Sequence, residues 1–479
     1  MILAVVILYL LVLFVVSRYA AGDGSNGTFF RARRGASWYM VAFGMVGASI
    51  SGITFVSVPG MVLHSGMTYL QTCLGFILGY FVVAFVLLPV YYRLNLTSIY
   101  TVLRDINEEA YKTGAAYFIF SKLLGSAAKF FVPCYILSEA LGTDFFLTML
   151  FLYALIWLYT KRGGIRTLVW TDTVQTLCML VALALIMHGV YAELGFASVG
   201  DCLAAIAATD YARVFEFSDW DSTTNFFKCF ISGIFIVVVM TGLDQDMMQK
   251  NLTCRTLRDA QKDMCSYGFA FVPVNAMFLI LGIMLAMLCA KTGTPLPERA
   301  DALLPMFAAD GRLGSGVLIF FTIGVIATSF STVDSALTAL TTSFCVDILG
   351  MSQSEEGGKA RHDEKVRRRV HLGMTLMLAV CTELFALLGT ESLIDTIYRL
   401  VGYTYGPLLG LFAYSLIHRK ARGGFLRYAV ALTCVLSPFL CFALDMMVPR
   451  LTGYHFGYEL LLLNGMITYI GLKISNAVS

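Results

Sequence analysis

The sequence predicts an all-α integral membrane protein with about 13 transmembrane helices. Of the 479 residues, 58% are hydrophobic and only 14% are charged, whereas soluble domains average about 45–50% and about 25%. The chain also contains many apolar segments of about 20 residues, the length that crosses a hydrocarbon core. Lys and Arg are concentrated in alternate connections between them. The lipid bilayer is therefore an expected partner, and a net charge of +3 gives no support for nucleic-acid binding.

Roughly thirteen segments have the length and composition of a span. They lie near 1–18, 38–60, 66–92, 114–142, 143–161, 166–191, 224–247, 264–290, 311–349, 366–389, 394–417, 425–448 and 454–475. The first has its basic residues after it rather than before it, so we expect a retained span and not a cleaved signal peptide. Segment 311–349 is longer than a span, and we expect it to run past the membrane at one end.

The basic residues predict the orientation. With the N-terminus outside, the inner connections and ends carry 25 of the 34 Lys and Arg, the outer ones carry six, and Lys122, Lys129 and Arg399 lie within spans. We expect a multi-pass protein of the cell (plasma or inner) membrane with a cytoplasmic C-terminus. The chain has no P-loop, HExxH or Ser/His/Asp arrangement and no sizeable soluble domain, so we do not expect an enzyme.

The second span carries small and polar residues at its centre. Five of them fall within eight positions: Gly47, Ser49, Ser51, Gly52 and Thr54. Such a segment can unwind and leave carbonyl oxygens free to bind a cation, which a membrane protein tolerates only along a cavity. The alternative is a small-residue face that packs against a neighbouring helix.

The ninth span carries a second polar cluster. Ser331 and Thr332 offer adjacent hydroxyl oxygens, and Thr328 lies one turn earlier. Oxygen ligands of this kind suit a hard cation such as sodium. Asp334 and Ser335 follow within the same span. The alternatives are hydroxyls that bond back to their own helix and an Asp334 that pairs with a neighbouring helix.

Three single residues complete the polar set. Asp172 lies near the inner end of the sixth span, where a helix N-terminal acid is the alternative interpretation. Lys129 lies near the middle of the fourth span, too deep to reach an interface. It is a candidate counter-charge for an anionic solute, or a partner for a carboxylate. Gln71 could add an amide to the same cavity, or simply join two helices.

At these residues the sequence resembles the sodium/solute symporter family, which includes the sodium/glucose, sodium/proline and sodium/sialic acid transporters. The resemblance covers almost the whole chain and rests on several motifs that occur in order. They are Gly47-Ala48-Ser49-Ile50-Ser51-Gly52 with Pro59-Gly60, Gly163-Gly164 with Trp170-Thr171-Asp172 and Gln175, Thr241-Gly242-Leu243-Asp244-Gln245 with Gln249, Ser331-Thr332 with Asp347, and Tyr405-Gly406-Pro407-Leu408-Leu409-Gly410.

The resemblance implies a fold of the leucine-transporter type, in which five helices are repeated upside down and sites lie at broken helices. Residues 38–191 would form the first repeat and 224–417 the second. Residues 192–223 would be an outside loop. Residues 1–37 would be a peripheral span and inside loop, and 418–479 would hold two peripheral spans.

The resemblance also implies ion sites. The shared sodium site would use the carbonyls of Gly47, Ile50 and Thr328 and the hydroxyls of Ser331 and Thr332. A possible second sodium would be held by Asp172, Asp334 and Ser335, together with the hydroxyl of Ser331. This sequence has Asp334 where a serine is usual, a change that could strengthen a cation site or admit a proton.

The implied function is sodium-coupled symport of a small organic solute by alternating access, with Na+ as the coupling ion. Solute contacts would come from Ser49, Ser51, Thr54, Gln71 and Lys129. Lys129 gives a point charge rather than the two-pronged donor of an arginine, and it favours an anionic, carboxylate-like solute. The alternatives are a proton-coupled symporter that uses Asp172 and Asp334, and a solute sensor without transport. The oligomeric state is left open.

Overall fold

The computed structural model describes residues 2–308, 313–351, 358–388, 393–418 and 428–478. The described residues form helices and connecting loops, with no β-strand among them. Ten helices are long and apolar enough to cross a membrane, two further pairs would do so as bent spans, and Ala4–Ala20 is a shorter apolar helix. These elements fall where the sequence places its spans. The predicted segment starts at 311 and 425 lie outside the described residues.

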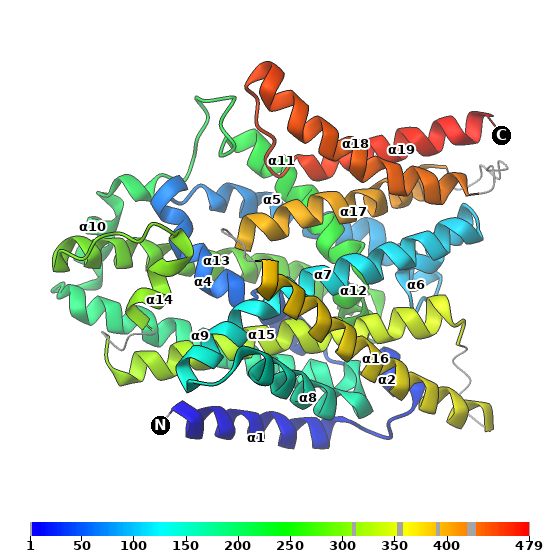
Figure 1. Cartoon of the computed structure of the whole chain (residues 1–479), viewed down its shortest axis with the longest axis horizontal. Helices are drawn as coiled ribbons and strands as arrows, with labels where there is room; N and C mark the ends of the chain where they lie inside the picture. The colour runs from blue at the N-terminus through cyan, green and yellow to red at the C-terminus, as the bar shows by residue number, and fades with distance from the viewer. Residues whose placement is uncertain (1, 309–312, 352–357, 389–392, 419–427, 479) are drawn as a thin grey trace.

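The long helices run side by side along one direction (Figure 1). They include α7 (Glu108–Leu141), α8 (Phe145–Gly163), α9 (Ile165–Leu194), α13 (Leu257–Thr292), α15 (Ser315–Ser343), α16 (Gly358–Leu388) and α17 (Leu393–Ile417). A further span joins α5 (Tyr69–Val82) to α6 (Leu88–Arg93) through a π turn. Helix α15 is almost completely buried from residue 321 to 343 and packs against α9, α7 and α4. The polar cluster of the ninth span therefore lies inside the bundle.

Peripheral helices flank this bundle. Helix α1 (Ile2–Ala20) lies along one edge, and α18 (Ala429–Thr452) and α19 (Leu460–Val478) lie along the opposite edge (Figure 1). The two chain ends lie at opposite ends of the helices. Which end faces the cytoplasm stays a prediction from the basic residues.

The second span is broken, as the sequence predicts. It consists of α3 (Trp38–Ser49) and α4 (Gly52–Ser65), which meet at an angle of 63°. Ile50 and Ser51 between them have extended backbone conformations. The Ser51 hydroxyl caps α4 by accepting the Thr54 amide at 3.3 Å. The last carbonyls of α3 are then left without helical partners, because a helix end always leaves four of them unpaired.

The seventh span is also broken. Helix α11 (Phe226–Val237) ends in a π turn, and α12 (Gln245–Asn251) leaves it at 71° after Asp244, whose side chain accepts the Asp246 amide at 2.8 Å. The predicted span stops at 247, and the orientation count places Lys250 in an inner loop. That assignment of Lys250 is wrong: it lies in α12 and is 2% exposed. Removing it from the 25 inner residues leaves 24 against six, so the bias survives.

Candidate ion and solute sites

The first break lies between α9 and α15. A Cβ atom on Gly47 would stand 2.0 Å from Thr176 Oγ1 of α9, and one on Gly52 would stand 2.3 Å from Ser329 Oγ of α15. Real Cβ atoms do not approach other atoms so closely, so only glycine allows both contacts. The break is thereby held against α15, the helix that carries the predicted hydroxyl ligands. Small residues here serve both close packing and an unwound backbone, the two alternatives that the sequence offers.

The hydroxyl protons of Ser331 and Thr332 are both used in hydrogen bonds to protein acceptors. Thr332 donates to the carbonyl of Thr328 at 2.9 Å, and Ser331 donates to Asp172 Oδ1 at 2.7 Å. A hydroxyl has one donor and two acceptor lone pairs, so both oxygens keep lone pairs for a cation. Back-bonding to the helix is therefore present at Thr332 and is compatible with ion binding. The side chains of Thr328, Ser331 and Thr332 are buried, and so is Ile50 at the break.

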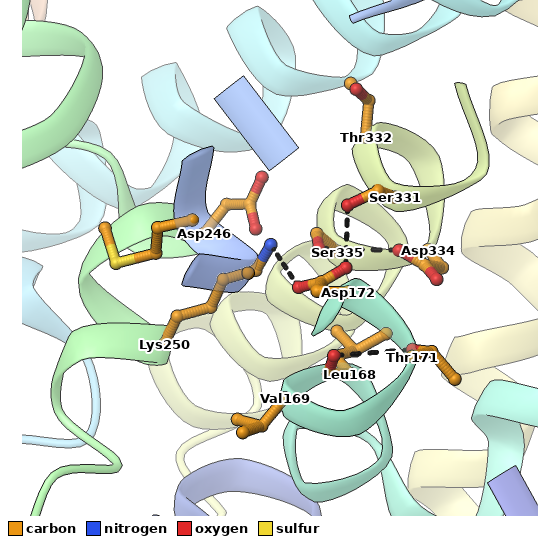
Figure 2. Close-up of polar contacts among 12 residues, drawn as sticks. Leu168, Val169, Thr171, Asp172, Asp246, Lys250, Ser331, Thr332, Asp334 and Ser335 are labelled. Carbon is orange, nitrogen blue, oxygen red and sulfur yellow. Dashed lines mark hydrogen bonds and ion pairs between the residues drawn. The ribbon is translucent and has the colours of Figure 1, made fainter. Parts of the chain in front are cut away.

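Asp172 stands in a buried charged cluster (Figure 2). Its Oδ2 atom lies 2.8 Å from Lys250 Nζ, and the two side chains are 1% and 2% exposed. Asp172 is not in the first turn of α9, so the alternative of a helix N-terminal acid is wrong. Its partners are Ser331 of α15 and Lys250 of α12, which lie 159 and 78 positions away in the sequence.

Asp334 faces different neighbours. Tyr159 of α8 donates to its Oδ2 atom at 2.6 Å, and Ser335 donates to Oδ1 at 3.4 Å. Within the part of the chain that the structure describes, Asp334 makes no ion pair with a basic side chain. The structure thus brings Asp172 and Asp334 into the same cluster (Figure 2), together with Ser331 and Ser335 of α15, the helix that also carries Asp334.

A cavity of about 140 Å³ lies beside the first break. Ser49, Ser51 and Thr54 line it from the break, Lys129 from α7, and Thr332 from α15. Four of the five predicted solute contacts therefore share one cavity. Aromatic side chains cover part of its wall: Tyr69, Phe76, Tyr80, Tyr267, Phe271 and Tyr405.

Gln71, the fifth predicted contact, lies elsewhere. Its Nε2 atom donates to the Thr224 carbonyl at 2.9 Å, and its Oε1 atom accepts the Glu216 amide at 3.1 Å. Both ends of the amide are therefore held by the chain that precedes α11. Gln71 is not among the residues that line the cavity, so it joins two segments, the alternative that the sequence left open.

The second break carries charges into the same cavity. Lys122 Nζ of α7 lies 3.1 Å from Asp244 and 2.7 Å from Asp246, and Tyr405 donates to Asp244 at 2.8 Å. Lys129 lies seven residues further along α7, and no ion pair forms on it among the described residues. A seven-residue step returns to nearly the same face of a helix. One face of α7 therefore presents a paired and an unpaired ammonium to the cavity.

Sequence reasoning missed Lys122, Asp244, Asp246 and Lys250 as site residues. Lys122 is visible as a charge within a span, but its partners are more than 120 positions away. Asp244 and Asp246 stand where the predicted seventh span ends and resemble interfacial acids. The sequence did contain a signal for this charged cluster: two acids, Asp244 and Asp246, at the end of one span, and a lysine, Lys122, within another span.

A second cavity, of about 550 Å³, lies at the other end of α4. Ser57, His64, Glu298 and Asp445 are among its lining residues, and Tyr69 lines both cavities. The central cavity thus has a neighbouring vestibule, and the Tyr69 side chain stands between the two.

Together, the fold and the site define a class of protein. A multi-pass helical bundle with two broken helices, unpaired carbonyls at one break and a polar cavity beside it has the architecture of secondary transporters. The model of the Sodium:solute symporter family matches residues 29–425, and the chain belongs to this family. The family consists of transporters rather than enzymes.

Curated relatives have low sequence identity to this chain but align with most of its length. The rabbit (Oryctolagus cuniculus) sodium-dependent multivitamin transporter is 25% identical over 403 residues, which cover 82% of this chain and 62% of the relative. The sodium/sialic acid symporter of Aliivibrio fischeri is 23% identical, over 84% of this chain and 80% of the relative. The chain thus spans less than two thirds of the rabbit transporter.

Solved structures share the fold. A substrate-bound, outward-open sodium-coupled sialic acid symporter superposes with a TM-score of 0.83 at 18% identity, over 100% of this chain and 98% of that chain. A nucleobase-cation-symport-1 transporter in a closed conformation gives a TM-score of 0.55 at 16% identity, over 95% and 96%. At such identities the likeness establishes the leucine-transporter-type fold and not the solute.

Proposed function

We propose that this protein is a sodium-coupled symporter that moves a small organic anion, of the carboxylate class, by alternating access. The main observation behind this proposal is the position of Thr332. Its hydroxyl belongs to the proposed sodium ligands, and its side chain also lines the central cavity. A cation bound at Thr332 would fix the wall against which the solute rests. Sodium and solute would then favour the same conformation, which is what coupling requires.

The proposed sodium site takes carbonyl oxygens from Gly47 and Ile50 at the first break and from Thr328, with the hydroxyls of Ser331 and Thr332. These are neutral oxygens, which suit a weakly held monovalent ion that must also leave. A tenfold sodium gradient supplies about 1.4 kcal/mol for each ion that crosses.

The proposed solute site takes its charge from Lys129. An ammonium that no described carboxylate pairs with, at the wall of a cavity, favours an anionic ligand, because any other ligand leaves its charge uncompensated. Ser51 and Thr54 add hydroxyl groups, and the aromatic wall accepts an apolar body. The Ser49 hydroxyl donates to the Met45 carbonyl at 2.9 Å and adds an acceptor oxygen. The proposed location is the plasma or inner membrane, and the distribution of basic residues supports an orientation with the N-terminus outside.

Thermal unfolding of the purified protein in sodium and in potassium, at equal ionic strength, tests the ion site. Sodium at 100 times its dissociation constant should stabilise the fold by about 2.7 kcal/mol. Ser331→Ala/Thr332→Ala should abolish this sodium-specific gain. Thr322→Ala is the matched control, because its hydroxyl bonds back to Leu318 at 2.8 Å on the same helix and should leave the gain intact.

Uptake into proteoliposomes then tests the solute class. We expect a sodium gradient to drive uptake of a carboxylate, and Lys129→Met to weaken it by roughly 10- to 150-fold, equivalent to about 1.5–3 kcal/mol for a charged hydrogen bond. Uptake that follows pH and ignores sodium would instead establish proton coupling. The candidate group is the buried Asp334, which forms no ion pair with a described basic side chain. Solute binding without any uptake would establish a sensor.

A further inference from the structure

Both oxygens of the Asp172 carboxylate already have partners. Lys250 Nζ lies 2.8 Å from Oδ2, and Ser331 donates to Oδ1 at 2.7 Å. Gln175 adds a donor to Oδ1 at 3.2 Å when its amide nitrogen faces Asp172. A sodium ion at Oδ2 would compete directly with the ammonium, because two cations in contact with one oxygen repel each other strongly.

The ammonium lies among the carboxylates of this cluster and contacts one of them, Asp172. Figure 2 shows Lys250 Nζ between Asp172 and the side chain of Asp246, with Asp334 on the far side of Asp172. The 2.8 Å contact with Asp172 is an ion pair without hydrogen-bond alignment, and Asp246 Oδ1 is a buried acceptor without a hydrogen-bond partner in the described residues. A lysine ammonium carries one positive charge, so it can neutralise a buried carboxylate as a monovalent ion does.

We propose that the Lys250 ammonium is a tethered cation at the second cation position, so that the protein binds one sodium ion and not two. This inference rests on the proposed sodium symport. It also gives Lys250 a positioning role: the ammonium fixes the Asp172 carboxylate, which accepts the hydrogen bond of the Ser331 hydroxyl and so leaves the Ser331 lone pairs for the sodium ion. One sodium carried with a monovalent carboxylate moves no net charge.

The alternative is an ion pair that only stabilises the fold, with a second sodium bound through Asp334 and Ser335. The two interpretations differ in the number of sodium ions bound. They also differ in the effect of removing the ammonium, because an uncompensated buried carboxylate is strongly disfavoured and recruits a cation.

Equilibrium binding of radioactive ²²Na⁺ to the purified full-length chain counts the ions. We expect one ion per wild-type chain and none in Ser331→Ala/Thr332→Ala. Lys250→Met should bind two, because Asp172 then needs a mobile cation. Lys250→Met/Asp172→Asn, which removes both charges, should return to one. The same variants are melted in sodium and potassium, and Lys250→Met should gain more from sodium than the wild type does.

The other possible results would overturn either the tethered cation or the proposed sodium coupling. Two ions in the wild type, or one ion in both wild type and Lys250→Met, would overturn the tethered cation while leaving sodium coupling in place. If Lys250→Met fails to fold in potassium, the proposal requires rescue by saturating sodium, and failure of that rescue overturns it. A wild type that binds no sodium overturns the proposed function itself.

Discussion

The two broken spans of this protein differ in chemistry: the first break is lined by neutral polar groups and the second by buried charges. At the first break, between α3 and α4, the chain turns with glycines and serines, and Ser51 caps the new helix. At the second break, between α11 and α12, the cap is Asp244, and Asp246 and Lys250 follow within one helix of seven residues. The first break presents neutral oxygens. The second presents three buried charges, each held by a charge on another helix.

The difference separates two uses of a broken membrane helix. Neutral oxygens bind a cation weakly enough to release it, whereas a buried carboxylate binds its counter-charge strongly because the surroundings screen it poorly. The charges of the second break are therefore neutralised by side chains of the protein itself: Asp244 and Asp246 by Lys122 of α7, and Lys250 by Asp172 of α9. We infer that the first break binds the transported ion, and that the second joins α12 to α7 and α9.

Replacing Lys122 is expected to have the largest effect on this comparison. Lys122→Met removes the ammonium that lies between Asp244 and Asp246 and leaves buried carboxylates uncompensated. Breaking a buried ion pair from one side costs on the order of 3–5 kcal/mol. We expect a loss of that size in the free energy of unfolding, measured by denaturant titration in mixed micelles.

Lys129→Met is the matched control for Lys122→Met. It removes an ammonium from the same helix and the same cavity, but one that no described carboxylate contacts. We expect it to lower solute affinity and to leave the free energy of unfolding nearly unchanged. Equal stability of the two variants would show that Lys122 does not stabilise the charges of the second break. The proposed difference between the two breaks would then be wrong.

The same contrast explains what could be predicted from the sequence. The first break is visible because its cause is local: Gly47, Ser51 and Gly52 are poor helix formers in the middle of an apolar span. The second break is hidden because its cause is not local. Its π turn lies in an apolar stretch, and Lys250 looks like a loop residue until Asp172 of α9 is placed beside it. Gln71 failed as a solute contact for the same reason, since its partners lie in a loop some 150 positions away.

Adding one methyl group at the first break should have the next largest effect. In Gly47→Ala the new Cβ would stand 2.0 Å from Thr176 Oγ1 and 3.0 Å from the Thr176 backbone. Relief of such overpacking costs about 1–3 kcal/mol. We expect this loss in the free energy of unfolding together with a smaller sodium-dependent rise in Tm, because the Gly47 carbonyl must move. Thermal scans in sodium and in potassium measure both.

Gly373→Ala serves as the control for Gly47→Ala. Nothing lies within 4 Å of a Cβ at Gly373 on α16, so alanine there should raise stability by up to about 1 kcal/mol through helix propensity. A Gly47→Ala variant that keeps the whole sodium response would show that the backbone of the first break does not contact the ion.

Replacing the capping residue at each break should have the smallest effect on stability, and it compares the two breaks directly. Ser51→Ala removes a capping oxygen and is expected to cost about 1 kcal/mol, whereas Ser51→Asn keeps an equivalent cap and should cost close to nothing. Asp244→Asn also keeps a cap, yet it removes the charge that faces Lys122, so it should cost clearly more than Ser51→Asn. Unfolding titrations of the three variants separate capping from charge, because Asn is a good cap at both positions. If Ser51→Asn and Asp244→Asn prove equally mild, the charge on Asp244 contributes nothing beyond its cap, and the two breaks differ only in sequence and not in how they are held.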